Sequence, residues 1–347
     1  MTDPVTVAVD ANGADHGPVE VARGAAAAAE HGVRVLLFGP AAQLGAVEGV
    51  EVVDAPLSIA KAEDAARAVR ANPGASIVAA VEAVADGRAD ALVAGGSTGT
   101  ALAASLFRIK RGRGIHRPAL AVLVPVPGSP FLLLDAGANV EVRPEHLVQF
   151  AHMGAAFMEA AMGMSRPRVA LLSNGAEATK GPEDLVAAHA VLAAPESRLN
   201  FIGNVEGFAI GTGEADVIVT DGFTGNVALK VMEGTSAVMM RAVRDAAESS
   251  KRSKAGGVLL RPALRELRDE LDPQAQGGAV LLGLRKLVVV PHGSFGAEGI
   301  ATAIELAARG VREDVVGRTL ERLAAAGALR RAPAEVSAAA SSVPDQP

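Results

Sequence analysis

The stretch Val217-Ile-Val-Thr-Asp-Gly-Phe-Thr-Gly-Asn226 contains the pattern that decides the fold. Its first three residues are apolar and β-branched, as in a buried strand, and Asp221–Asn226 is a polar, Gly-rich turn that opens a helical segment. Short apolar runs that alternate with helical segments in this way are typical of α/β proteins with a mostly parallel sheet.

The same passage from strand to helix occurs four more times along the chain. The other turns are Asp10–Pro18, Gly95–Thr100, Ser173–Pro182 and His292–Gly296. Because ligands bind at the carboxyl ends of parallel strands, we expect all five turns at one edge of the sheet. Free N–H groups at helix starts and glycine backbones suit anions, phosphate above all. The turns therefore predict a site that handles phosphate or carboxylate.

Further strands are expected wherever short apolar runs recur. They are Val5–Val9, Val33–Phe38, Ala91–Ala94, Leu120–Val124, Phe131–Leu134, Val169–Leu172 and Leu287–Val290. The run Phe131–Leu134 lacks polar alternation, which indicates a strand buried on both faces. A helix should follow Pro144, with Leu147, Phe150 and Phe157 on its buried face.

Composition excludes several classes of protein. The 347 residues are 50% hydrophobic and 21% charged, with 38 glycines and no Cys, Trp or Tyr, so collagen, coiled-coil and wholly disordered chains are excluded. The lack of Cys removes disulfides, thiolate metal sites and a Cys nucleophile. The net charge of -6 argues against a chain-wide nucleic-acid surface. With no basic leader and no apolar run of about 18 residues, we expect a cytoplasmic protein.

Two motif searches leave one enzymatic alternative open. No turn has the spacing of a phosphate-binding P-loop, and Gly211-Thr-Gly213 lacks the third glycine of a dinucleotide loop. Gly95-Gly-Ser-Thr-Gly99 does match the Gly-x-Ser-x-Gly of a hydrolase nucleophile, and Asp221 and His292 follow in the right order. We favour a ligand-binding turn, since no oxyanion segment lies upstream, but a serine hydrolase using Ser97 and a purely structural turn both stay open.

Histidine and lysine positions bear on the chemistry of the site. The seven histidines show no metal-ligand spacing, so we expect a metal-free site. His292 starts a Gly-rich turn and could equally be catalytic or brace that turn. Lys180 is the only lysine within the five turns, and it is either a phosphate clamp beside helix-start amides or a solvated loop residue.

Two basic clusters stand out against the acidic background. The first consists of Arg108, Lys110, Arg111, Arg113 and Arg117, and it is either a solvated loop or a patch that attracts an acidic partner. The second borders an apolar stripe, on a helix expected to start at Pro262, through Val258–Leu260, Leu264, Leu267 and Leu271. Its basic residues are Lys251, Arg252, Lys254, Arg261, Arg265 and Arg268. This pattern favours a subunit interface first and an anionic membrane surface second.

Taken in order from Val5 to Arg309, these segments resemble the bacterial phosphate acyltransferases of phospholipid synthesis. The resemblance is carried by Asp10–Pro18, Ala94–Leu102, Ile115–Leu120, Leu134–Asn139, Val169–Gly181, Asp221–Val227 with Lys230 and Glu233, Gly277–Gly283 and His292–Ser294. The Asp-Gly-Phe-Thr-Gly-Asn block is the most specific. This chain departs from the family pattern at Asn12 and Ala14, which replace Met and Gly, and at Ser97, where Asn is usual.

The resemblance implies a fold and a reaction. The fold is that of isocitrate and isopropylmalate dehydrogenases and phosphotransacetylases, with two α/β lobes around a cleft, assembled as a homodimer. The reaction moves a fatty acyl group from acyl-acyl carrier protein to inorganic phosphate, with no cofactor. We expect one two-lobed domain over residues 1–331, with a helical dimer or membrane-contact excursion at 244–272 and a disordered tail at 332–347.

The resemblance also assigns roles to residues. Lys180 and Asn226 would be catalytic, Lys180 toward phosphate and Asn226 toward a carbonyl or phosphate oxygen. The binding residues would be Asn174, Gly175, Thr224, Gly225, Ser97, Thr98, Asn139 and His292. The turns would be braced by Asp10, Gly13, Asp135 and Asp221, and we expect Asn139 to brace as well.

The implied partners are acidic acyl carrier protein and a second copy of the chain. The basic cluster Arg108–Arg117 would dock the carrier, and the membrane-bound glycerol-3-phosphate acyltransferase would act next, which places the protein at the inner face of the membrane. The alternatives are a serine hydrolase and a non-catalytic anion-binding scaffold.

Overall fold

Within residues 4–330, which the computed structural model describes, eleven strands form one sheet in the order β3-β2-β1-β4-β11-β10-β5-β6-β9-β7-β8. The strands are β1 Thr6–Asp10, β2 Arg34–Gly39, β3 Val50–Asp54, β4 Ala91–Ala94, β5 Ala119–Val124, β6 Phe131–Leu134, β7 Arg168–Ser173, β8 Asn200–Glu206, β9 Val217–Val219, β10 Ala279–Leu282 and β11 Leu287–Val290. The tail expected at 332–347 lies outside the described residues.

All eight expected strands are confirmed, and three were missed. Two of the missed strands, β3 and β8, are the edge strands of the sheet, and both are largely half-buried or exposed. Edge strands carry polar residues and lack the continuous apolar run that marks a buried strand. The third, β10, joins the two halves of the sheet.

The sheet changes direction at its centre. Strands β1 to β4 and β11 are parallel, as are β6, β7, β8 and β9, whereas the pairs β11–β10, β10–β5 and β5–β6 are antiparallel. These three reversals make the two parallel halves point in opposite directions. The mostly parallel sheet is therefore confirmed, but the prediction that all five turns share one edge is wrong.

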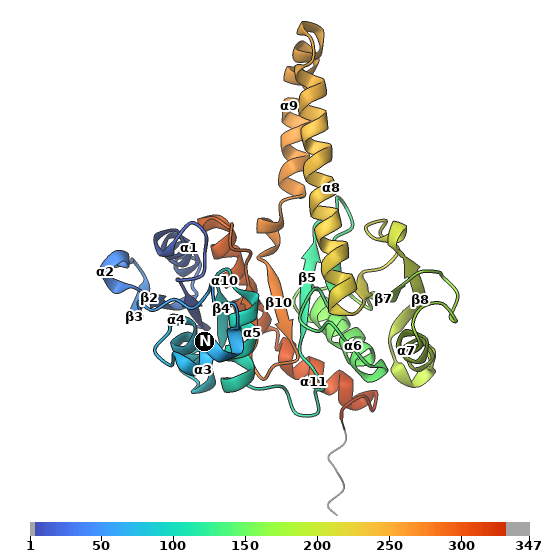
Figure 1. The fold of residues 1–347 in the computed structure, drawn as a ribbon, viewed down its shortest axis with the longest axis horizontal. Helices are drawn as coiled ribbons and strands as arrows, with labels where there is room; N and C mark the ends of the chain where they lie inside the picture. The colour runs from blue at the N-terminus through green and yellow to red at the C-terminus, as the bar shows by residue number, and fades with distance from the viewer. Residues whose placement is uncertain (1–3, 331–347) are drawn as a thin grey trace, which may run out of the picture.

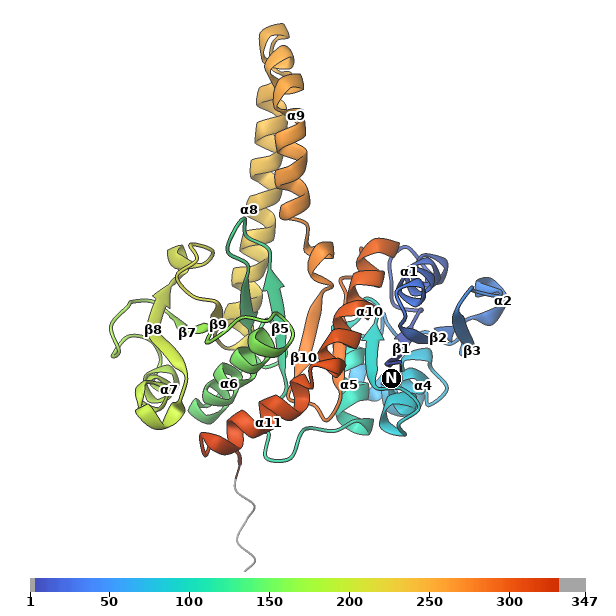
Figure 2. The ribbon, with the colours of Figure 1, turned by 180° about the vertical axis from the view of Figure 1, so that it is seen from behind.

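The described residues contain eleven α-helices, which flank both faces of the sheet except for the projecting pair α8 and α9 (Figures 1 and 2). They are α1 Pro18–Glu30, α2 Ala41–Leu44, α3 Ala65–Ala71, α4 Ser76–Ala85, α5 Thr98–Arg108, α6 Pro144–Ala160, α7 Glu183–Ala193, α8 Gly222–Glu248, α9 Lys251–Glu270, α10 Ala297–Arg312 and α11 Val315–Ala325. Alternate residues of each strand face opposite cores: in β6, Leu132 and Leu134 face α6, whereas Phe131 and Leu133 face the other side. The helix expected after Pro144 is confirmed and almost entirely buried.

Helices α8 and α9 form a long hairpin that projects from the two-lobed body (Figure 1). The expectation that a helix starts at Pro262 is wrong, because α9 begins at Lys251 and carries Pro262 in its interior. Its start is fixed by Ser250, whose hydroxyl accepts a hydrogen bond from the N–H of Ser253 at 3.0 Å. Within residues 4–330, none of the helices combines the length and the apolar character needed to span a bilayer.

Candidate active site

The first part of α8, from Gly222 to Glu233, separates two pockets, because residues three or four apart share one side of a helix. Phe223, Thr224 and Val227 line one pocket, and Asn226, Lys230 and Glu233 line the other. We call the first, of about 1250 Å³, the C-terminal pocket, and the second, of about 600 Å³, the interlobe pocket. The Asp-Gly-Phe-Thr-Gly-Asn segment thus contributes to both.

The interlobe pocket brings together turns from both halves of the sheet. Three predicted site residues line it, Thr98 after β4, Asn226 after β9 and His292 after β11. Its apolar surface includes Leu120 and Val122 of β5 and Ala279 of β10, and its polar groups include Lys230, whose ammonium is 2.8 Å from a carboxylate oxygen of Glu233. The turns after β4 and β11 lie at the opposite edge of the sheet from the turn after β9. Helix α8 nevertheless brings Asn226 into the pocket that the turns after β4 and β11 line.

The turns after β1, β4 and β11 pack against one another through their backbones. A Cβ placed on Gly13 would lie 1.5 Å from the carbonyl oxygen of Gly95, so only glycine fits at position 13. The N–H of Asp15 donates to the carbonyl of Gly293 at 2.8 Å. Ala14 does not adopt positive φ, so replacement of the family's glycine leaves this turn unstrained.

Asp10 lies beneath this group of turns and is 4% exposed. Its carboxylate accepts a hydrogen bond from the N–H of Asn12 at 3.1 Å. Burial raises the pKa of Asp10 from 3.8 to about 6, because the charged form loses its hydration. Asp10 thus holds the first turn from the inside, and it lines neither pocket.

A second buried carboxylate, Asp135, organises the turn after β6. One of its oxygens accepts from the N–H groups of Leu120 at 3.0 Å and Ala138 at 2.9 Å. The other oxygen accepts from the backbone and the side-chain amide of Asn139, each at 2.7 Å. The carbonyl of Asn139 in turn accepts from the N–H of Gly222 at 2.7 Å. These bonds tie the start of β5, the end of β6 and the start of α8 into one unit.

The C-terminal pocket contains the predicted residues Asn174, Thr224 and Arg117. Asp221 caps α8, since its carboxylate accepts from the N–H of Thr224 at 2.8 Å, and its carbonyl accepts from the N–H of Gly225 at 2.9 Å. The amides of Thr224 and Gly225 are therefore both used within the protein.

Lys180 and Asn226 do not line the same pocket. Lys180 is exposed and lies outside the walls of both pockets, although Gly181 beside it lines the C-terminal pocket. Its side chain crosses Gly175, where a Cβ would lie 2.6 Å from Cγ of Lys180. Glycine at position 175 thus leaves room for this lysine.

Ser97, Asp221 and His292, the residues of the hydrolase alternative, do not contact one another through hydrogen bonds. His292 shares a hydrogen bond of 2.8 Å with the hydroxyl of Ser294, and Asp221 caps α8. Within residues 4–330, no hydrogen bond joins Ser97 to either of them, and Ser97 is the residue that precedes α5. This arrangement lacks the contacts of a catalytic triad.

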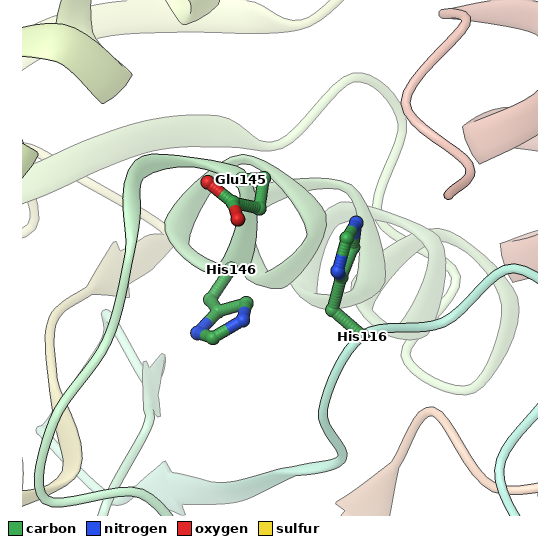
Figure 3. Close-up of side chains that lie close together, drawn as sticks. All are labelled: His116, Glu145 and His146. Atoms are coloured by element: carbon green, nitrogen blue, oxygen red, sulfur yellow. The ribbon is translucent and has the colours of Figure 1, made fainter. Parts of the chain in front are cut away.

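Beside the C-terminal pocket, His116, Glu145 and His146 place donor atoms within 4.8 Å of one another (Figure 3). Glu145 and His146 come from the first turn of α6, and His116 from the segment before β5. Burial lowers the pKa of both imidazoles, whereas the charge of Glu145 raises it and the charge of Arg143 lowers it. The three residues come from two segments far apart in the sequence, so the spacing of the histidines did not indicate this cluster.

The basic cluster lies at the end of α5 and on the segment leading to β5. Arg108 forms an ion pair with Glu82 at 3.2 Å, and Arg111 donates to the carbonyl of His116. Lys110 and Arg113 are exposed, and Arg117 lines the C-terminal pocket. The cluster therefore extends from the surface to the wall of that pocket.

Sequence reasoning missed several residues of the C-terminal pocket. Phe223, Arg143 and His146 line it, as does Asp184. Phe223 and Val227 are four residues apart on α8, and this spacing could have indicated an apolar face. Arg143 and His146 start α6, and nothing in the sequence pattern links that helix to the turns after β7 and β9.

Sheet, lobes and pockets define a two-lobed α/β protein of the phosphotransacetylase fold. A phosphotransacetylase from Streptococcus pyogenes matches over 90% of this chain and 95% of its own, with a TM-score of 0.60 and 19% identity. A 4-hydroxythreonine-4-phosphate dehydrogenase from Klebsiella pneumoniae matches over 87% and 98%, with a TM-score of 0.52 and 16% identity. At these identities the likeness shows the fold alone.

Sequence comparison shows the family. The chain belongs to the family described as "Fatty acid synthesis protein", which matches residues 5–318. A relative from Heliobacterium modesticaldum, named phosphate acyltransferase, is 43% identical over 327 residues, which cover 91% of this chain and 97% of the relative.

Proposed function

We propose that this chain is a phosphate acyltransferase that moves a fatty acyl group from acyl-acyl carrier protein to inorganic phosphate. The observation that carries the proposal is the 43% identity to a phosphate acyltransferase over 91% of the chain. The position of Asp221–Asn226 between the two pockets supports it, because one short segment contacts both possible ligand sites.

The proposed reaction needs no strong acid or base from the protein. A phosphate oxygen attacks the thioester carbonyl, the new C–O bond forms, and the C–S bond breaks with its electron pair on the pantetheine sulfur. Phosphate is anionic at neutral pH, and a thiol of pKa about 8.5 leaves readily and takes up a proton from solvent or from phosphate. The protein must instead hold the reactants together and stabilise the developing oxyanion.

Asn226 and Thr224 are suited to the oxyanion and to phosphate, because both place polar side chains at the start of α8. Lys180 would supply positive charge to phosphate. Its long side chain is exposed beside Gly181, so rotation about its side-chain bonds brings the ammonium toward the C-terminal pocket. Asn174, Gly175 and Gly225 would shape this region, and Thr98 and His292 would serve the interlobe pocket.

The hairpin supports assembly of two copies. Val231, Val238 and Met239 of α8 and Leu259 of α9 are each more than half exposed, and α9 has no buried residue. Pairing with the hairpin of a second chain would cover these side chains. The homodimer would work beside the membrane, where a membrane-bound glycerol-3-phosphate acyltransferase would consume the acyl phosphate.

The acidic carrier protein would dock on the cluster Arg108–Arg117, whose exposed cations Lys110 and Arg113 are available for steering. Reversal of Arg111 and Arg113 to Glu should weaken carrier binding at low salt. Unchanged affinity would show that the carrier docks elsewhere.

One assay tests the reaction. The protein is mixed with palmitoyl-acyl carrier protein, and the free carrier thiol is followed with and without inorganic phosphate. Release that requires phosphate supports the acyltransferase. Release without phosphate that survives Lys180→Ala indicates a hydrolase through Ser97, and absence of release indicates a non-catalytic anion-binding scaffold.

A further inference from the structure

We propose that the C-terminal pocket holds the fatty acyl chain of the substrate. This inference rests on the proposed function, and it assigns one part of the substrate to one of the two pockets that α8 separates. The acyl chain is the apolar part of that substrate, so the pocket that takes it must offer a continuous apolar wall.

Apolar side chains from four elements form such a wall. Leu147 of α6, Leu172 of β7 and Leu185 of α7 are 2%, 7% and 8% exposed, and they make the pocket continuous with the core. Phe223 and Val227 of α8 face them and are 63% and 46% exposed. Because these two apolar side chains are exposed to water beside the pocket, covering them with an apolar ligand would contribute favourable free energy to binding.

Polar groups are placed where the thioester end would lie. Asn174 follows β7 and Asp221 and Thr224 follow β9, and these two strands are paired and parallel. Their carboxyl ends therefore gather these groups at one edge of the pocket. A chain whose carbonyl lies at the start of α8, between Thr224 and Asn226, would extend into the C-terminal pocket toward Leu147 and Leu185.

The interlobe pocket is a poorer match for an acyl chain. Both pockets include ionisable residues in their lining, but the volume of the interlobe pocket is about 600 Å³ against about 1250 Å³ for the C-terminal pocket, so it has room for a shorter chain. Each methylene moved from water to an apolar wall raises affinity roughly three- to fourfold. A long chain therefore prefers the C-terminal pocket.

The entrance also fits the proposed carrier. Arg117 belongs to the basic cluster and lines the C-terminal pocket, together with Arg143. An acidic carrier docked on the cluster would thus deliver its arm past Arg117. The interlobe pocket has no residue of the cluster in its wall.

A matched pair of substitutions tests the assignment by chain length. Val142→Phe adds bulk in the C-terminal pocket, and Val122→Phe adds the same bulk in the interlobe pocket. We expect Val142→Phe to lower kcat/KM for palmitoyl-carrier relative to butyryl-carrier by roughly tenfold or more, and Val122→Phe to leave this ratio unchanged. An unchanged ratio in Val142→Phe, or a lower ratio in Val122→Phe, would overturn the assignment.

A binding measurement makes the test independent of turnover. The chain has no Trp, so Ile210→Trp in the C-terminal pocket and Val122→Trp in the interlobe pocket each provide a single fluorophore. Palmitate brominated along its chain should quench Trp at position 210 and not at 122, with unbrominated palmitate as control. Quenching only at position 122, or none at 210, contradicts the proposal. Failure of phosphate-dependent transfer by the wild type, with selective quenching at 210, would instead reject the proposed reaction alone.

Discussion

Asp135 and Asn139 are joined twice: the carboxylate of Asp135 accepts from both the backbone N–H and the side-chain amide of Asn139, each at 2.7 Å. The same amide also donates to the carbonyl of Pro118 at 2.7 Å. Asp135 is fully buried and Asn139 nearly so. The pair therefore fixes the turn against which α8 begins.

Removal of the Asp135 carboxylate should be far more costly than removal of an exposed cap. In Asp135→Ala, buried N–H groups lose their acceptor, and we expect the free energy of unfolding to fall by roughly 3 kcal/mol or more. Asp221→Ala removes only the cap of α8 and should cost about 1 kcal/mol. Urea unfolding of both variants measures the difference, and equal losses would contradict the role given to Asp135.

Gly225 should not tolerate a methyl group. Its added Cβ would lie 2.0 Å from the carbonyl oxygen of Asp135, so Gly225→Ala must displace α8 and with it Asn226 and Thr224. We expect loss of stability and of acyl transfer together. Gly234→Ala, on the same helix with no atom within 4 Å of the added Cβ, is the control and should gain up to about 1 kcal/mol from helix propensity.

Asp10 should make stability fall with rising pH. Burial raises its pKa to about 6 in the folded chain, against 3.8 for an aspartate in water, so between these values the folded state holds a proton that the unfolded state releases. Linkage then lowers the free energy of unfolding by about 3 kcal/mol as pH rises through this window. Asp10→Asn should remove this dependence, which urea unfolding across the window can measure. A parallel pH profile for wild type and variant would refute the assignment.

His152 should make stability fall with falling pH, the opposite of the effect of Asp10. Its ring nitrogens are buried without hydrogen-bond partners, and burial lowers its pKa from 6.5 to about 4. Between these values the unfolded state takes up a proton that the folded state refuses, so stability falls with falling pH, by roughly 3 kcal/mol in all. His152→Leu should therefore gain stability over the wild type as pH falls from 6.5 to 4. Thermal unfolding of the wild type and the variant at matched pH values measures this gain, and a constant difference in stability across the range would contradict the prediction.

Asn226 and Lys180 should differ in the kinetic constant that they control. If Asn226 stabilises the oxyanion, Asn226→Ala should lower kcat by about 100-fold or more. Lys180→Ala should mainly raise KM for phosphate, because it removes charge that binds the nucleophile. Lys61→Ala, a change at an exposed lysine outside both pockets, is the control. A change in kcat alone for Lys180→Ala would argue against a phosphate-binding role.

The strands could be predicted because their apolar runs are continuous, as in Phe131–Leu134. The direction of the strands could not, since nothing in a short apolar run such as β10, Ala279–Leu282, tells whether it pairs parallel or antiparallel. That single strand, with the β5–β6 pair, reverses half of the sheet. The turns were thus identified correctly, but those after β1, β4 and β11 lie at the opposite edge from those after β7 and β9.

For the site residues too, local roles could be predicted from the sequence, whereas the pocket that each residue lines could not. The resemblance assigned Asp221 to bracing its turn, and its carboxylate does cap α8 by accepting from the N–H of Thr224. The separation of Asn226 from Thr224 follows from helical periodicity, but which pocket each one lines depends on contacts between distant segments, such as β5, α6 and α7.

Helix α8 runs without interruption from Gly222 to Glu248, so its first turns and its far end belong to one rigid rod about 40 Å long. Rotation of this rod about its own axis would turn Thr224 toward one pocket while it turns Asn226 away from the other. Because Thr224 and Asn226 are carried by the same rod, a shift of α8 would change the walls of both pockets together.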